Sequence, residues 1–166
     1  MALGAAALMI GASTAGLRIN YTASAPRGLW IERSIDNPVL QRGMLVSICP
    51  PPQPVVHAIV ERGLLPVGNC PDTQVAPLLK SIAAIPGDRI KLQHGSPAII
   101  NGVPLPNTSA LPSMPAWADG EYLVQPGQIW IFSSYSKRSF DSRYFGPVDS
   151  NAVRGEATPL LTTGDN

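Results

Sequence analysis

Residues 77–88 read PLLKSIAAIPGD, a strongly apolar run that ends in a turn signal. Proline at position 86 fixes φ, and Gly87 accepts a positive φ, so Pro86-Gly87-Asp88 is expected to form a turn. The run before it is short and apolar, which predicts a buried strand. Lys80 is the only charged residue of that run.

The segments on either side predict further strands. Arg89-Ile90-Lys91-Leu92 alternates between polar and apolar residues, as a half-buried strand does. Asn101-Gly102 is a strong hairpin signal within residues 97–105. We expect other strands over 28–35, 44–48, 121–124, 128–132 and 153–158, and one short helix over 55–63 that ends at Gly63.

The composition favours strands joined by many turns. Proline accounts for 18 of the 166 residues and is scattered along the chain, which leaves little room for long helices. The length corresponds to about one domain. We therefore expect a mostly β body, a folded sheet or a partly closed barrel with short helices. The stretch 104–118 has four prolines and little periodicity, so residues 93–118 are expected to form a small, exposed excursion outside the core.

Charge is sparse and balanced. Only 14% of the residues are charged and the net charge is +1. A nucleic-acid binder would show a clustered basic surface, so nucleic acid is not an expected partner.

Residues 1–17 read MALGAAALMIGASTAGL and carry no charged side chain. A membrane-spanning helix needs about 20 apolar residues, so this segment is of marginal length. A transmembrane anchor, a cleaved secretory signal and an apolar core helix remain open. The anchor is favoured because a signal peptide needs a basic region before its apolar run, and this chain shows none. Residues 18–166 would then form a single domain.

Cys49 and Cys70 are the only cysteines, and their spacing matches no metal-binding pattern. A disulfide between them would close a loop of about 20 residues and stabilise the fold by about 3 kcal/mol. Two free buried thiols are the alternative. A disulfide would favour an oxidising compartment such as the periplasm. No metal or cofactor is expected.

Lys80 is a candidate general base. A lysine within an apolar strand is expected to point inward or to line a cleft, where loss of hydration lowers its pKa. A neutral amine can activate a serine hydroxyl, which is a weak nucleophile on its own. Ser24 is the best partner because it follows the apolar segment closely and precedes Ala25-Pro26. Taken singly, each of these features is more often a turn or a surface charge, and it is their combination and order that point to an enzyme.

The chain resembles the type I signal peptidases, and within them the TraF group of conjugative-transfer peptidases. The matching segments are residues 20–30, Lys80 through Pro86-Gly87-Asp88, and residues 139–146; the Cys49/Cys70 region and Gly120-Glu121-Tyr122 are also similar. The resemblance covers essentially everything after residue 17. It departs from the general signal-peptidase pattern in two ways: Ala25 alone separates the serine from the proline, and the excursion at 93–118 is small beside the large second domain of some signal peptidases.

The resemblance implies a role for each matched residue. Ser24 would be the nucleophile and Lys80 the general base. Ser139 would hydrogen-bond and orient the lysine amine, and Thr22 would assist the oxyanion hole. Asp141 and Arg143 would brace the site.

The resemblance also implies a fold and a function. It implies a signal-peptidase-like β body behind an apolar membrane-anchor helix, held in the inner membrane with its catalytic domain in the periplasm. The substrate would be a pilin precursor or another preprotein, either trimmed or cyclised. A general signal peptidase, a self-cleaving repressor and a non-enzymatic scaffold of a secretion channel are the alternatives. A triad built on His57 or His94 would be a rival mechanism.

Overall fold

The computed structural model describes residues 16–22, 24–35 and 39–163. Most of the expected N-terminal apolar helix therefore lies outside the described residues. Leu17, which we assigned to that helix, already belongs to the first strand, β1 (Leu17–Asn20). Within the described ranges, no helix has the length and apolar character needed to cross a bilayer.

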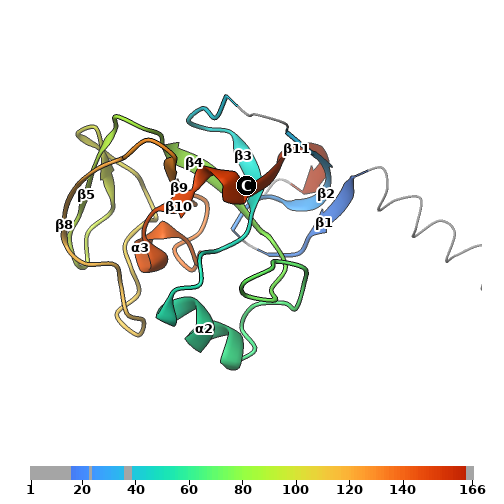
Figure 1. The fold of residues 1–166 in the computed structure, drawn as a ribbon, viewed down its shortest axis with the longest axis horizontal. Helices are drawn as coiled ribbons and strands as arrows, with labels where there is room; N and C mark the ends of the chain where they lie inside the picture. The colour runs from blue at the N-terminus through green and yellow to red at the C-terminus, as the bar shows by residue number, and fades with distance from the viewer. Residues whose placement is uncertain (1–15, 23, 36–38, 164–166) are drawn as a thin grey trace, which may run out of the picture.

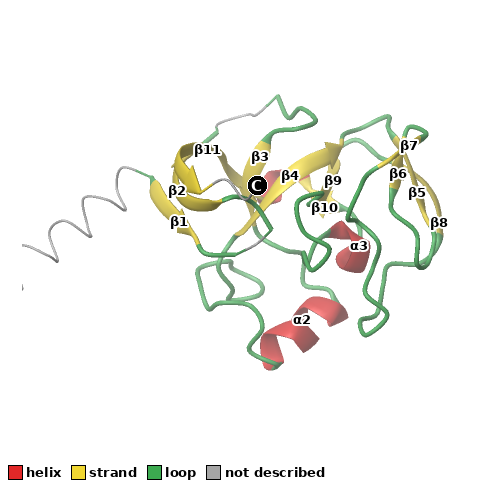
Figure 2. Cartoon of the chain, turned by 180° about the vertical axis from the view of Figure 1, so that it is seen from behind, coloured by secondary structure: helices red, strands yellow, loops and turns green. Residues whose placement is uncertain are grey.

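The described chain is mostly β and forms two antiparallel sheets with short helices, as Figures 1 and 2 show. The larger sheet has the order β1, β2 (Arg27–Arg33), β11 (Val153–Thr163), β3 (Leu45–Ile48), β4 (Leu78–Ala84), β9 (Gln128–Phe132) and β10 (Val148–Asp149). The smaller sheet has the order β7 (Val103–Pro104), β6 (Ile99–Ile100), β5 (Arg89–Leu92) and β8 (Gly120–Leu123). The helices are α2 (Pro54–Glu61), α3 (Ser142–Phe145) and the 3-10 turn η1 (Ser150–Ala152).

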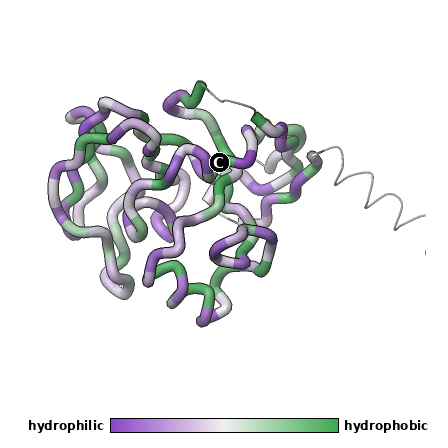
Figure 3. Tube along the Cα trace, viewed as in Figure 1, coloured by the Kyte–Doolittle hydropathy of each residue, from purple (hydrophilic) through white to green (hydrophobic). Residues whose placement is uncertain are grey.

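The smaller sheet lies at the end of the molecule opposite β1 and β2, in both views (Figures 1 and 2). Strand β9 of the larger sheet connects that sheet to the smaller one, because both faces of the strand are buried. Ile129 and Ile131 face a core that includes α3, whereas Trp130 and Phe132 face a second core shared with the smaller sheet. Hydrophobic and hydrophilic positions are intermixed along the chain at both ends of the molecule (Figure 3).

Strand β4 confirms the prediction made from the apolar run. Its residues alternate strictly between buried and half-buried, and Lys80 lies on the buried face between Leu78 and Ile82. The period of two along a strand is what turns the lysine inward. Strand β4 pairs with β3 on one side and with β9 on the other.

The Pro86-Gly87-Asp88 turn is held by the Asp88 carboxylate. That group accepts hydrogen bonds from the Ile85 backbone N–H at 2.9 Å and from Asn101 at 2.8 Å, and it forms an ion pair with Arg42. Hydrogen bonding from Arg42 is the main cause that lowers the pKa of Asp88 to about 2. This turn therefore ties the end of β4 to the β6–β7 hairpin.

One expectation needs correction. Residues 105–119 contain no strand, as predicted, but they do not lie outside the core. Thr108 is 2% exposed, and its hydroxyl accepts a hydrogen bond from the Ala98 backbone N–H. Trp117 packs against the second core. The prolines prevent regular structure, but the apolar and hydroxyl side chains between them still find buried partners.

Strand β11 is longer than the predicted 153–158 and joins two parts of the sheet. Its first residues pair with β3, and the strand also pairs with β2 from Arg33 to Arg27. At the far end Gly28 has a φ of 140°, and a Cβ there would lie 2.1 Å from the Leu161 carbonyl oxygen. Glycine thus permits the close approach of β11 to the start of β2, beside the segment that carries Ser24.

Candidate active site

A cleft of about 870 Å³ opens beside β4. Its walls come from β1 and the segment after it, from β4, from residues 64–69 and 76–77, and from the loop of residues 136–140. Ser24, Thr22, Lys80 and Ser139 all line it. Four residues singled out from the sequence therefore meet in one cavity, although they come from three separate segments.

Ser24 and Lys80 are in direct contact. The Lys80 Nζ donates a hydrogen bond to the Ser24 Oγ at 2.9 Å, across a sequence separation of 56 residues. It also donates to the backbone carbonyl of Leu79 at 3.2 Å. Lys80 is 4% exposed, while Ser24 is half-buried. A nucleophile and a base within hydrogen-bond reach of each other are the minimum arrangement for acyl transfer.

Burial is the main cause that lowers the pKa of Lys80 from 10.5 to about 8. The Asp141 charge opposes this effect, and the Arg143 charge adds to it. Desolvation penalises the ammonium form because a buried charge loses its hydration. The amine is thus brought close to the range in which a general base works at physiological pH.

Thr22 also contacts the Ser24 side chain, and Asn20 in turn holds Thr22. The Thr22 Oγ1 lies 3.0 Å from the Ser24 Oγ and donates to the Asn20 Oδ1 at 2.8 Å. Because the Thr22 hydroxyl proton is donated to Asn20, the Thr22 oxygen acts as the acceptor for the Ser24 hydroxyl. Thr22 could serve as an oxyanion donor only after its proton turns away from Asn20.

Asn20 was not singled out from the sequence. Its amide Nδ2 donates to the backbone carbonyls of Thr22, Ala25 and Pro26, at 3.1, 3.0 and 3.1 Å. The side chain therefore folds the segment between β1 and β2 around itself. A polar residue four residues before the serine was the only available signal.

Ser139 differs from the expectation. Its side chain is 3% exposed and lines the cleft, but its hydroxyl has no hydrogen-bond partner in the described part of the chain. The expected hydrogen bond to the lysine amine is absent, because the amine donates to Ser24 and to the Leu79 carbonyl instead.

Asp141 and Arg143 form a buried, bidentate ion pair. The Arg143 Nε donates to the Asp141 Oδ1 at 2.7 Å, and the Nη2 donates to the Oδ2 at 2.9 Å. The guanidinium Nη1 group reaches the backbone carbonyls of Asn107, Ser109 and Lys137. The pair thus connects α3 to the irregular segment after β7 and to the loop that carries Ser139.

Ser133, immediately after β9, was also missed. Its hydroxyl donates to the backbone carbonyl of Ser24 at 2.6 Å, across 109 residues of sequence. Its own backbone N–H donates to Asp141 at 3.0 Å, and its carbonyl accepts from Arg143 at 3.1 Å. A serine in a polar loop carries no local signal of such a contact.

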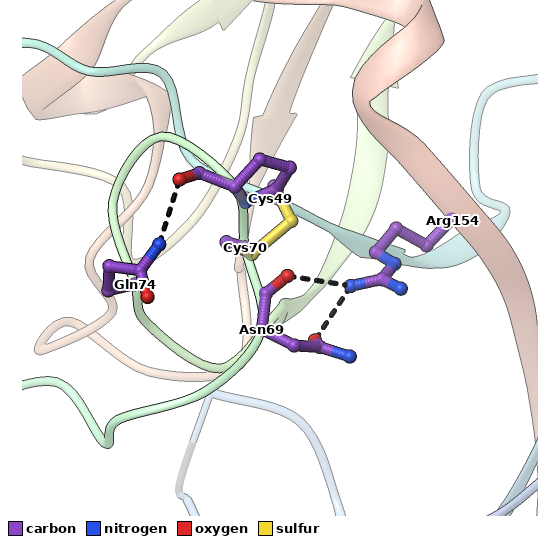
Figure 4. Close-up of a disulfide and its surroundings, with 6 residues drawn as sticks. Cys49, Asn69, Cys70, Gln74 and Arg154 are labelled. Atoms are coloured by element: carbon purple, nitrogen blue, oxygen red, sulfur yellow. Dashed lines mark hydrogen bonds between the residues drawn. A yellow bond between two sulfur atoms is a disulfide. The ribbon is translucent and has the colours of Figure 1, made fainter.

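One wall of the cleft is fixed by a disulfide. Cys49 and Cys70 are bonded, with their Cα atoms 5.5 Å apart. Figure 4 shows that Arg154 of β11 also reaches this wall, donating to the Asn69 Oδ1 at 2.7 Å. Gln74 closes the loop by donating to the Pro71 carbonyl at 2.9 Å. The loop residues that line the cleft are therefore anchored to β3 and to β11.

The two histidines are exposed, and neither of them lines the cleft. His57 lies on α2, and His94 lies in the turn after β5. Within the described ranges, no group of three or more His, Cys, Asp or Glu side chains is placed to hold a metal ion.

The site thus pairs a serine with a buried amine at the side of a β-sheet. Residues 1–161 match the family described as signal peptidase, peptidase S26, and the chain belongs to that family.

Proteins similar to this chain include conjugal and plasmid transfer proteins. The conjugal transfer protein TraF of Agrobacterium fabrum is 37% identical over 170 residues, which cover 96% of this chain and 93% of the relative. The plasmid transfer protein TraF of Escherichia coli is 32% identical over 166 residues, covering 96% and 91%. The predicted resemblance to signal peptidases of the TraF group is thus confirmed.

Among solved structures, the crystal structure of a signal peptidase I from Enterococcus faecalis aligns with a TM-score of 0.41 and 22% identity. The alignment covers 74% of this chain and 98% of that one.

Proposed function

We propose that this chain is a membrane-bound serine endopeptidase in which Ser24 is the nucleophile and Lys80 the general base. The observation that carries the proposal is the 2.9 Å contact between the Lys80 Nζ and the Ser24 Oγ, made by an amine whose pKa burial lowers to about 8. Membership of the signal peptidase family supports the same chemistry.

The reaction would proceed through an acyl-enzyme. Neutral Lys80 takes the Ser24 proton as the Oγ attacks the scissile carbonyl, and the resulting ammonium then gives that proton to the leaving amine. The Ser24 backbone N–H and Thr22 would stabilise the oxyanion, with one donor typically worth about 2.7–4 kcal/mol of barrier. Attack of water on the acyl-enzyme releases a linear product, whereas attack by the N-terminal amine of the substrate itself gives a cyclic one.

Asp141, Arg143 and Ser139 would support this site. The ion pair contributes opposing electrostatic effects to the pKa of Lys80 and fixes the segments beside it. The buried Ser139 hydroxyl lines the same cleft as the dyad, where it could donate to bound substrate or to a displaced amine.

We further propose that the substrate is a preprotein of a conjugation system, a pilin precursor in particular, processed at the inner membrane with the catalytic domain in the periplasm. The TraF relatives support the link to conjugation. The disulfide favours an oxidising compartment, and residues 1–17 would provide the anchor.

The test uses Ser24→Ala and Lys80→Ala in full-length protein, with mass spectrometry of the candidate pilin to distinguish untouched, trimmed and cyclised forms. Both variants are expected to fold and to leave the precursor untouched. Lys91→Ala is the matched control, because Lys91 is exposed on the smaller sheet, away from the cleft. Retained processing in a folded Ser24→Ala or Lys80→Ala variant would refute the dyad and favour the scaffold reading.

A further inference from the structure

The contact between Ser133 and Ser24 links the buried ion pair to the nucleophile. The Ser133 hydroxyl donates a hydrogen bond to the Ser24 carbonyl. The Ser133 backbone N–H donates to Asp141, and its carbonyl accepts from Arg143. Ser133 is itself 3% exposed. Each of its polar groups is therefore held, and its hydroxyl also accepts from the Tyr135 backbone N–H at 3.2 Å.

The nucleophile needs such a contact because it lies outside regular structure. Residues 21, 22 and 24–26 belong to no strand or helix. Lys80 approaches from β4, and Ser133 follows β9, the neighbour of β4 in the sheet. Residue 81 pairs with residue 132 in that ladder, so the ladder sets the position of the Ser133 hydroxyl relative to the Lys80 amine.

We propose that Ser133 is a positioning residue, which fixes the Ser24 carbonyl and so keeps the Ser24 Oγ within reach of Lys80. The inference rests on the proposed function. Small displacements of a nucleophile can reduce a rate by about 100-fold. Ser133 does not touch the reacting atoms, so its loss is expected to lower kcat without changing how substrate binds.

The test compares Ser133→Ala with Ser142→Ala. Ser142 is a matched control because its buried hydroxyl also bonds a backbone group, the Ile131 N–H at 3.0 Å, but does not contact Ser24. Ser133→Ala should lower kcat about tenfold or more, with KM within about twofold and an unchanged pH midpoint. Ser142→Ala should lose comparable thermal stability but keep kcat within about twofold.

Ser133→Thr keeps the hydroxyl and should restore most of kcat, and Ser133→Cys, a weaker donor, should be intermediate. These two variants decide the question if Ser133→Ala does not fold. Unchanged kcat in folded Ser133→Ala, equal kcat losses in both alanine variants, or no rescue by threonine would overturn the proposal. A failed dyad would instead appear as retained activity in Ser24→Ala.

A second, independent observation concerns the charge of the cleft. Among the residues that the structure describes, four of the twelve Lys and Arg line it, but only one of the nine Asp and Glu does. That residue, Glu32, is already paired with Arg18 at 3.1 Å. Arg138 and Arg154 are exposed, and in the described chain neither has a carboxylate partner.

We infer that the bound substrate segment presents a carboxylate to Arg138 and Arg154, either from an acidic side chain or from its own C-terminus. This deepens the proposed function by naming a chemical feature of the substrate. Exposed charge pairs contribute little free energy each and are screened by salt. The expected preference is therefore several-fold and greatest at low ionic strength.

The probes are fluorescent peptides spanning the candidate cleavage site, with Glu or Gln at each flanking position and with a free or amidated C-terminus. Binding is measured with the Ser24→Ala variant, so no turnover is required. Tighter binding of a Glu peptide would identify a side chain, and tighter binding of the free acid would identify the terminus. Either preference should disappear in Arg138→Gln or Arg154→Gln, but not in Arg89→Gln, which alters an exposed arginine outside the cleft.

Equal affinity for every member of the series at low salt would overturn this inference. A preference that survives both cleft substitutions would do the same. Neither result bears on the dyad, which is tested by cleavage.

Discussion

Lys80 combines a structural cost with a proposed chemical role. Its aliphatic stem packs on the buried face of β4, and its amine meets a half-buried hydroxyl. Burial of an unpaired ammonium is unfavourable, and the lowered pKa is the thermodynamic sign of that cost. A residue retained under this cost is a strong candidate for function.

The proposed role of Lys80 predicts the pH dependence of catalysis. With a pKa of about 8, the neutral fraction should rise about tenfold per pH unit below that value and level off above it. We expect kcat/KM for peptide cleavage to follow this curve between about pH 5.5 and pH 9.5. A rate that is independent of pH, with the chemical step limiting, would contradict an amine base.

Stability should also depend on pH through the same residue. Because the folded-state pKa is about 8 and the ordinary value is 10.5, the unfolded chain binds more protons between these pH values. The stability of the wild type should therefore rise with pH across this window, and the cost of burying Lys80 is greatest below it. Lys80→Met should be more stable than wild type near pH 6 by up to roughly 3 kcal/mol.

Chemical denaturation at several pH values measures this difference. It should shrink between about pH 8 and pH 10.5. Equal stability of the two proteins near pH 6, or a difference that does not change with pH, would argue against a depressed lysine pKa.

At the scale of elements, the site depends on how β4, β9 and α3 meet. Strand β4 carries the amine, Ser133 directly follows β9, and the start of α3 carries the ion pair. The Asp141 side chain also caps α3 by accepting from the Arg143 backbone N–H. The same carboxylate therefore orders the start of the helix and neutralises the guanidinium. It also holds Ser133, whose hydroxyl contacts the Ser24 carbonyl.

Removing one partner of this pair should be costly. Asp141→Asn leaves a buried guanidinium without its counter-charge, and such changes typically cost about 3–5 kcal/mol. It also removes the charge that raises the pKa of Lys80, so the pH midpoint of any remaining activity should fall.

Thermal unfolding and the pH profile test both expectations. Asp119→Asn is the control, since Asp119 is exposed and does not line the cleft. Wild-type stability together with an unmoved pH midpoint in Asp141→Asn would show that the ion pair does not support the site.

At the scale of the whole molecule, one cleft is assembled from distant segments of the chain. Its floor is the larger sheet, while the walls include a loop that a disulfide joins to β3. The second core lies behind β9 and supports the sheet from the side opposite Lys80. It includes an edge-to-face pair, Trp117 and Trp130, whose ring centroids are 6.4 Å apart. The molecule thus has rigid elements beneath the reacting groups and a cross-linked wall beside them.

Removing the disulfide should loosen that wall. The double variant Cys49→Ser/Cys70→Ser is expected to lose about 3 kcal/mol of stability in the loop-entropy model. KM should rise more than kcat falls, because the loop lines the cleft but contributes no dyad residue. Treating the wild type with dithiothreitol should reproduce the change, and the double variant should not respond. Unaltered KM in a folded double variant would show that the loop is dispensable for substrate binding.

Much of the fold was predictable because its signals are local. The apolar run containing Lys80, the turn at Pro86-Gly87-Asp88 and the hairpin at Asn101-Gly102 are each specified by neighbouring residues, and each forms where expected. The strands β1 and β10 were not predicted. They are four and two residues long, too short for a period of two to emerge, and pairing with an adjacent strand defines them.

The residues of the candidate site divide in the same way. Residue type and order along the chain were enough to select Ser24 and Lys80 as a pair, because a serine before Ala-Pro and a lone lysine in an apolar strand are visible locally. Only the tertiary structure placed the Ser133 hydroxyl on the Ser24 carbonyl and turned the lysine amine to Ser24 rather than to Ser139. Hydrogen bonds act over about 3 Å, so contacts between distant residues depend on how the strands pair in space.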